Sequence, residues 1–99
     1  AAEVRERVPE PLRGRVTVAA GRTDLAGLAG ILGRSGAVVC NDTGVGHLAR
    51  AWGVPLVSVT GGEPETRWGP HPGGPGPGAV FRNDVPCAPC LKWACDDLY

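Results

Sequence analysis

The residues best suited to chemistry form one short segment, Asn41-Asp42-Thr43-Gly44-Val45-Gly46-His47. It follows the apolar run Ala37–Cys40 and precedes a helix-forming stretch. Gly44 and Gly46 let the backbone approach a ligand without a Cβ in the way. The first-turn N–H groups of a helix are free donors, and the helix dipole favours an anion there. The segment therefore predicts a phosphate-binding turn between a strand and a helix.

The same residues also have a purely structural interpretation. Asp42 and Thr43 are residue types that cap helix N-termini, and composition alone does not separate capping from ligand binding. His47, one turn inside the helix, could donate to a phosphate or satisfy a neighbouring carbonyl, which is the commoner role of an isolated histidine. A second glycine-containing loop, Thr60–Pro64, follows the next apolar run and could close over the same ligand.

Short elements alternate along the chain in the order that a parallel sheet requires. The expected elements are a helix within 1–8 that stops at Pro9, a strand at 16–19, a helix at 24–34, a strand at 37–40, a helix at 45–52, a strand at 56–60 and a last strand at 79–81. Successive βαβ units are right-handed, and ligands bind at the carboxyl ends of the strands. Asp42 and Gly61 should therefore lie at the same edge of the sheet.

Apolar patterning predicts how these elements are buried. Leu25, Leu28, Ile31 and Leu32 fall on one side of the 24–34 helix, a face that should pack on the sheet. The runs 37–40 and 56–60 are continuously apolar or nearly so, which is typical of strands buried on both faces of a parallel sheet.

Length and composition describe one small globular domain. The chain has 99 residues, 42% of them apolar and 20% charged, with a formal net charge of zero. These values give no electrostatic footprint for nucleic acid. No apolar run approaches the roughly 18 residues of a membrane span, and no signal peptide is recognisable. We therefore expect a cytoplasmic protein without a transmembrane segment or a nucleic-acid partner.

Four cysteines raise a different possibility. Cys87, Cys90 and Cys95 follow a C-x2-C-x4-C spacing, whereas Cys40 lies in an expected strand and should be a small core residue. Three thiols fall short of the four ligands of a structural zinc site, although His71 or Asp96 could complete one. Free thiols are the favoured interpretation and no metal is assigned, but a zinc-organised binding module remains the alternative.

An aspartic protease is a remote alternative because of the tripeptide Asp42-Thr43-Gly44. In such enzymes two of these loops share one proton. That fold requires alternating β-strands around the tripeptide, whereas residues 47–51 favour a helix. The protease interpretation is therefore disfavoured.

A longer pattern is much more specific than the turn alone. It reads Asp42-Thr43-Gly44-x-x-His47-Leu48-Ala49-x-Ala51-x-Gly53-x-Pro55, then Trp68-Gly69-Pro70 and Cys87-x-Pro-Cys90, with Gly21-Arg22-Thr23-Asp24-Leu25 upstream. Over residues 15–95 the chain resembles the C-terminal domain of the bacterial heptosyltransferases, glycosyltransferase family 9, which include the ADP-heptose:lipopolysaccharide heptosyltransferases.

The resemblance implies a fold and an activity. The family has two Rossmann-like domains in the GT-B arrangement and moves a heptose from ADP-heptose to the lipopolysaccharide core with inversion. Residues 1–84 would then be an incomplete C-terminal nucleotide-sugar-binding domain, and residues 85–99 a cysteine-containing tail. The expected partners are an ADP-heptose-like donor, a glycan or glycolipid acceptor and an N-terminal domain of the same enzyme, with no cofactor. The full-length protein would be cytoplasmic or peripheral at the inner membrane face.

The resemblance also assigns roles to residues of this chain. The donor-binding residues that it implies are Asp42, Thr43, Gly44 and His47 around the diphosphate and Thr23 near the adenine. No catalytic residue is expected here, because the family's general base belongs to the N-terminal domain. The chain alone should therefore bind donor weakly and catalyse nothing.

Overall fold

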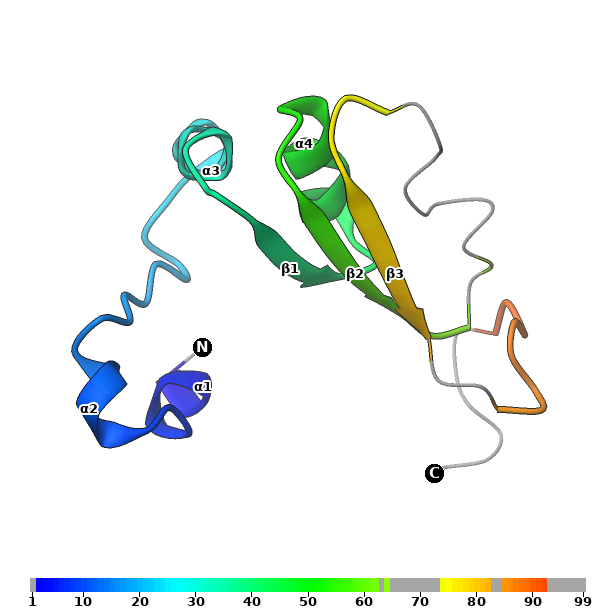
Figure 1. Ribbon diagram of the computed structural model, residues 1–99, viewed down its shortest axis with the longest axis horizontal. Helices are drawn as coiled ribbons and strands as arrows, with labels where there is room; N and C mark the ends of the chain where they lie inside the picture. The colour runs from blue at the N-terminus through cyan, green and yellow to red at the C-terminus, as the bar shows by residue number, and fades with distance from the viewer. Residues whose placement is uncertain (1, 63, 65–73, 83–84, 93–99) are drawn as a thin grey trace.

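The computed structural model describes residues 2–62, 64, 74–82 and 85–92 as four helices and three strands (Figure 1). Their bounds are α1 Ala2–Glu6, α2 Glu10–Arg13, α3 Leu25–Gly33, β1 Val38–Asn41, α4 Gly44–Ala51, β2 Leu56–Thr60 and β3 Gly78–Arg82. The strands form one sheet in the order β1-β2-β3, and both pairings are parallel. The chain is thus an α/β protein with a partial Rossmann-like sheet, as the sequence predicted.

The register places the two glycine-containing loops at one edge of the sheet. Val39 pairs with Val57, and Asn41 pairs with Val59. One residue further on, the amide of Asp42 donates to the carbonyl oxygen of Val59 at 3.2 Å. The predicted common edge for Asp42 and Gly61 is therefore confirmed.

Helix α4 covers one face of the sheet and brings the core together. It packs on β1 and β2, and α3 packs against α4 (Figure 1). The buried apolar residues are Leu32, Ala49, Val54 and Leu56. Gly53, at φ +71°, ends the turn after α4 in a conformation that favours glycine. The core therefore lies between α3, α4 and a single side of the sheet.

The prediction that the strands at 37–40 and 56–60 are buried on both faces was wrong. Val39, Val59 and Phe81 are 73%, 48% and 61% exposed. Val59 and Phe81 are register partners, so they share the sheet face opposite the buried Leu56. Because α4 lies on the Leu56 side, the strands are buried on one face only.

Only two of the four apolar residues on the predicted inner face of α3 pack on the core. Leu32 is buried and Leu28 packs on the core, but Leu25 and Ile31 are 73% and 46% exposed. The reason is that α3 packs against the neighbouring helix α4. This contact covers only the side of α3 that carries Leu28 and Leu32.

The N-terminal third of the chain differs most from the secondary structure that the sequence predicted. The predicted strand at 16–19 is irregular chain between α2 and α3 (Figure 1). A β-prone run becomes a strand only when a neighbour completes its hydrogen bonds, and in the described sheet β1 pairs with β2 alone. The expected first helix is present as α1, whereas α2, which carries Pro11 in its first turn, was not predicted. None of the described helices combines the length and the apolar character that crossing a membrane requires.

The start of α3 offers a stability prediction. Asp24 is its N-cap, and its carboxylate accepts a hydrogen bond from the amide of Gly27 at 2.8 Å. Asp24→Ala removes this acceptor and should lower the free energy of unfolding by about 1 kcal/mol. Urea denaturation of the two proteins measures the loss. Asp24→Asn keeps an equivalent cap and should behave like the parent, so equal losses in both variants would contradict the capping role.

Candidate functional site

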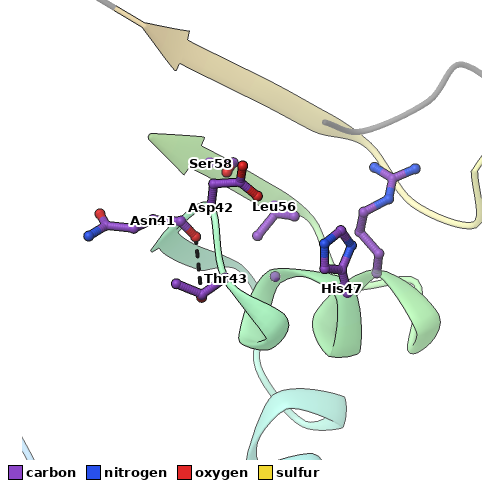
Figure 2. Close-up of a pocket in the computed structure, with 8 residues that line it drawn as sticks. Asn41, Asp42, Thr43, His47, Leu56 and Ser58 are labelled. Carbon is purple, nitrogen blue, oxygen red and sulfur yellow. Dashed lines mark hydrogen bonds between the residues drawn. The ribbon is translucent and has the colours of Figure 1, made fainter. Parts of the chain in front are cut away.

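The turn between β1 and α4 leaves the helix N-terminus without a side-chain cap from its N-cap residue. Thr43 occupies the N-cap position with an extended backbone, but its side chain makes no capping hydrogen bond. Its Oγ1 donates instead to the carbonyl oxygen of Asn41 at 3.3 Å (Figure 2). The carboxylate of Asp42 accepts no hydrogen bond from the described residues. The capping interpretation of these two side chains therefore finds no support in the geometry.

Three of the five predicted site residues line one small cavity at this turn. Asp42 and Thr43 come from the loop and His47 from α4; in Figure 2 Asp42 and His47 lie on either side of Leu56. The full lining is Asn41, Asp42, Thr43, Gly46, His47, Arg50, Leu56 and Ser58. Its volume is about 10 Å³, which is room for one water molecule. The cavity is therefore too small to hold a nucleotide, and a ligand of that size would have to lie outside it, against the residues at its rim.

The other two predicted residues do not line the cavity. Gly44 is the first residue of α4, and a Cβ built on it would meet no atom within 4 Å. Thr23 is exposed just before α3, where its side chain lies beside Gly27. The structure therefore places Gly44 at the turn, next to the cavity, and does not bring Thr23 to it.

Sequence reasoning missed two polar residues of this cavity. Ser58 is a buried residue of β2 and becomes a neighbour only through its register with Cys40. Arg50 is half-buried near the end of α4. A signal for Arg50 was available, because residues three apart on a helix share a side and Arg50 follows His47 by three.

The side chain of Cys40, on β1, lies close to Gly46 of α4. A Cβ on Gly46 would lie 3.0 Å from the Sγ of Cys40, so glycine is needed for α4 to approach β1 this closely. Burial raises the pKa of the Cys40 thiol, and the negative charge of Asp42 raises it further. The thiol is therefore protonated at neutral pH, in agreement with the expected core role.

The two alternative interpretations have different outcomes. The protease interpretation is wrong, because His47 lies in α4 and the surrounding sheet is parallel. For zinc, Cys87 is exposed and Cys90 half-buried, both as free thiols. No group of three or more metal-binding side chains occurs among the residues that the structure describes. His71, Cys95 and Asp96 lie outside the described residues.

The sequence of this chain is similar to that of a known enzyme and to a family profile. Lipopolysaccharide heptosyltransferase 1 of Pseudomonas aeruginosa is 43% identical to this chain over 81 residues, which cover 75% of this chain and 20% of that protein. The chain thus spans only a small part of the length of this relative. No solved structure matches the chain. The sequence profile of glycosyltransferase family 9 (heptosyltransferase) matches residues 1–97, so the chain belongs to this family.

Proposed function

We propose that this chain is the donor-binding part of a longer, inverting glycosyltransferase. The enzyme moves a heptose or a related sugar from a nucleotide diphosphate such as ADP-heptose to a lipopolysaccharide core or another glycan or glycolipid. Family membership and the relative's name support the reaction class. The observation that carries the donor role is the turn from Asn41 to Gly44, which presents a helix N-terminus without an N-cap side-chain bond at the carboxyl edge of the sheet.

The turn suits a diphosphate for three reasons. The first-turn amides of α4 carry the positive end of the helix dipole, which favours an anion. In the part of the chain that the structure describes, nothing beyond the adjoining backbone lies within 4 Å of the position of a Gly44 Cβ, so a ligand can reach the backbone. His47 is exposed one turn further along the helix and lines the same surface as Asp42.

The contribution to catalysis is electrostatic. As the bond between the sugar and the diphosphate breaks, negative charge grows on the departing nucleotide. Fixed N–H donors at the α4 N-terminus and the imidazole of His47 stabilise that charge, an effect typically worth a few kcal/mol in the transition state. Proton abstraction from the acceptor falls to a general base on another domain of the full-length protein. A lipopolysaccharide-core acceptor is anchored in a membrane, so the proposal places the full-length enzyme in the cytoplasm or at the inner membrane face.

Gly44→Ala separates ligand binding from stability. Among the described residues, the added methyl meets no atom within 4 Å beyond its chain neighbours and the backbone of its own helix, and alanine is the better helix former. Stability should therefore stay equal or rise by about 0.5 kcal/mol. The same methyl would stand where the diphosphate approaches the backbone, so affinity for ADP should fall about 10-fold, which is about 1.4 kcal/mol. Calorimetric titration of the full-length protein with ADP measures the change.

The matched control is Gly36→Ala. Gly36 also has open space around it, but it precedes β1 and lies at the opposite end of that strand. This variant should bind ADP like the parent. Equal ADP affinity in the Gly44 and Gly36 variants would refute diphosphate binding at the turn.

A further inference from the structure

Cys87 and Cys90 lie in a segment that returns to the sheet after β3. This segment, residues 85–92, is drawn in orange in Figure 1 beside the carboxyl ends of β2 and β3. The amides of Cys90 and Leu91 donate to the carbonyl oxygen of Gly62, in the loop after β2, at 3.0 and 2.9 Å. These two hydrogen bonds hold the cysteines at the carboxyl edge of the sheet.

Both thiols line one cavity at this edge. Cys87 is exposed and Cys90 is half-buried, and both are free thiols. The cavity has a volume of about 240 Å³, and its lining includes Thr60, Gly62 and Lys92. A small molecule in this cavity would therefore meet both sulfur atoms.

The backbone around the two cysteines changes direction twice. The amide of Ala88 donates to the carbonyl oxygen of Val85 at 3.0 Å, which closes a turn, and the chain bends again at Pro89. A disulfide requires Cα atoms about 4 to 7 Å apart, whereas an extended chain of three residues spans about 10 Å. The two bends therefore favour the approach of the thiols.

Thr60 adds a polar group without a partner to the cavity. The residue is 9% exposed, and its Oγ1 is buried without a hydrogen-bond partner among the described residues. Buried hydroxyl groups nearly always have a partner, so this exception indicates a group that binds in the cavity. The volume corresponds to about eight water molecules, which is room for the sulfur-bearing end of a small molecule.

We propose that Cys87 and Cys90 form a reversible dithiol site that reacts with low-molecular-weight disulfides of the glutathione type. The thiolate of the exposed Cys87 attacks one sulfur of the small disulfide, which gives a mixed disulfide and releases one small thiolate. The thiolate of Cys90 then attacks the Cys87 sulfur and releases the second small thiolate. The protein gives up two electrons and two protons, and the small disulfide takes them up to become two thiols.

The proposal does not depend on sugar transfer. In a reducing compartment a disulfide is usually transient and typical of catalytic or redox-sensing sites. The exposure of the two thiols agrees with this use, because the attacking sulfur must be accessible, whereas the second sulfur reacts within the protein.

Tryptic digestion isolates the pair. Cleavage after Arg82 and Lys92 gives a peptide of residues 83–92, in which Cys87 and Cys90 are the only cysteines. The reduced full-length protein is incubated with oxidised glutathione, alkylated with N-ethylmaleimide in denaturant, and digested. The peptide should lose both alkylatable thiols and the mass of two hydrogen atoms. Dithiothreitol should restore both thiols.

Variants assign the two steps. Cys90→Ser should stop after the first step, so its peptide should carry one glutathione. Cys87→Ser leaves only the half-buried thiol and should react several-fold more slowly. Cys95→Ser is the matched control and should form the disulfide at the parent rate. Cys40, a half-buried residue of β1, should keep its alkylatable thiol in every sample.

Three results would overturn the dithiol site. The first is a parent peptide that keeps both alkylatable thiols after treatment with oxidised glutathione. The second is a disulfide that joins this peptide to the one containing Cys95 or to a second protein molecule. The third is stoichiometric zinc on the purified parent that is lost in Cys90→Ser, because the thiols would then be metal ligands. The first two need only the parent protein, so the test does not rely on the folding of a variant.

Discussion

His47→Ala in the full-length protein is expected to slow sugar transfer from ADP-heptose about 100-fold, the usual cost of removing one preorganised donor from a developing negative charge. His47 is exposed on α4, at the surface that Asp42 and Thr43 line. An exposed side chain contributes little to packing, so the free energy of unfolding should change by no more than about 0.5 kcal/mol. Rates at saturating donor report the effect on turnover, and thermal melting reports stability.

Two further variants make the result specific. His47→Gln keeps a neutral N–H donor on a side chain of similar reach, so its rate should lie between those of the parent and the alanine variant. Arg34→Ala removes a cation from the exposed end of α3 and should leave the rate unchanged, which controls for a general loss of positive charge. Transfer by His47→Ala at the parent rate would mean that the imidazole does not act on the donor.

The part of the fold that carries the proposed site is the part that local sequence determines. The 37–40 run, the two glycines of the turn and Gly53 after α4 act over a few residues each, and β1, α4 and β2 lie where these signals place them. The common edge of Asp42 and Gly61 then follows from the geometry of a parallel sheet. Predictions of this kind need no knowledge of distant contacts.

The features that sequence missed depend on contacts between distant segments. Val16–Ala19 has the composition of a strand but no pairing neighbour in the described sheet, and Val39 is apolar yet exposed because α4 covers the other face. Ser58 joins the first cavity only through strand register. The cavity at Thr60 exists because the segment 85–92 returns to the β2 loop, a contact that no local pattern encodes.

The backbone contact between Gly53 and Gly76 should be the most sensitive point for stability among these predictions. A Cβ on Gly76 would overlap the carbonyl oxygen of Gly53 and lie 2.7 Å from its carbonyl carbon. A Cβ on Gly53 would in turn lie 3.0 Å from the carbonyl oxygen of Pro75. The turn after α4 thus packs directly against the chain entering β3, and backbone atoms cannot move aside as a flexible side chain would.

Gly76→Ala should therefore destabilise the domain by about 3 kcal/mol, at the upper end of the usual cost of overpacking. Hydrogen exchange of the backbone amides of β2 and β3 in the full-length protein measures the loss of stability in these two strands. Gly30→Ala is the matched control: it adds the same methyl inside α3, where nothing lies within 4 Å, and should stabilise by about 0.5 kcal/mol or more. If both variants shift protection in the same direction, the close packing of Gly53 and Gly76 does not hold β3 in the sheet.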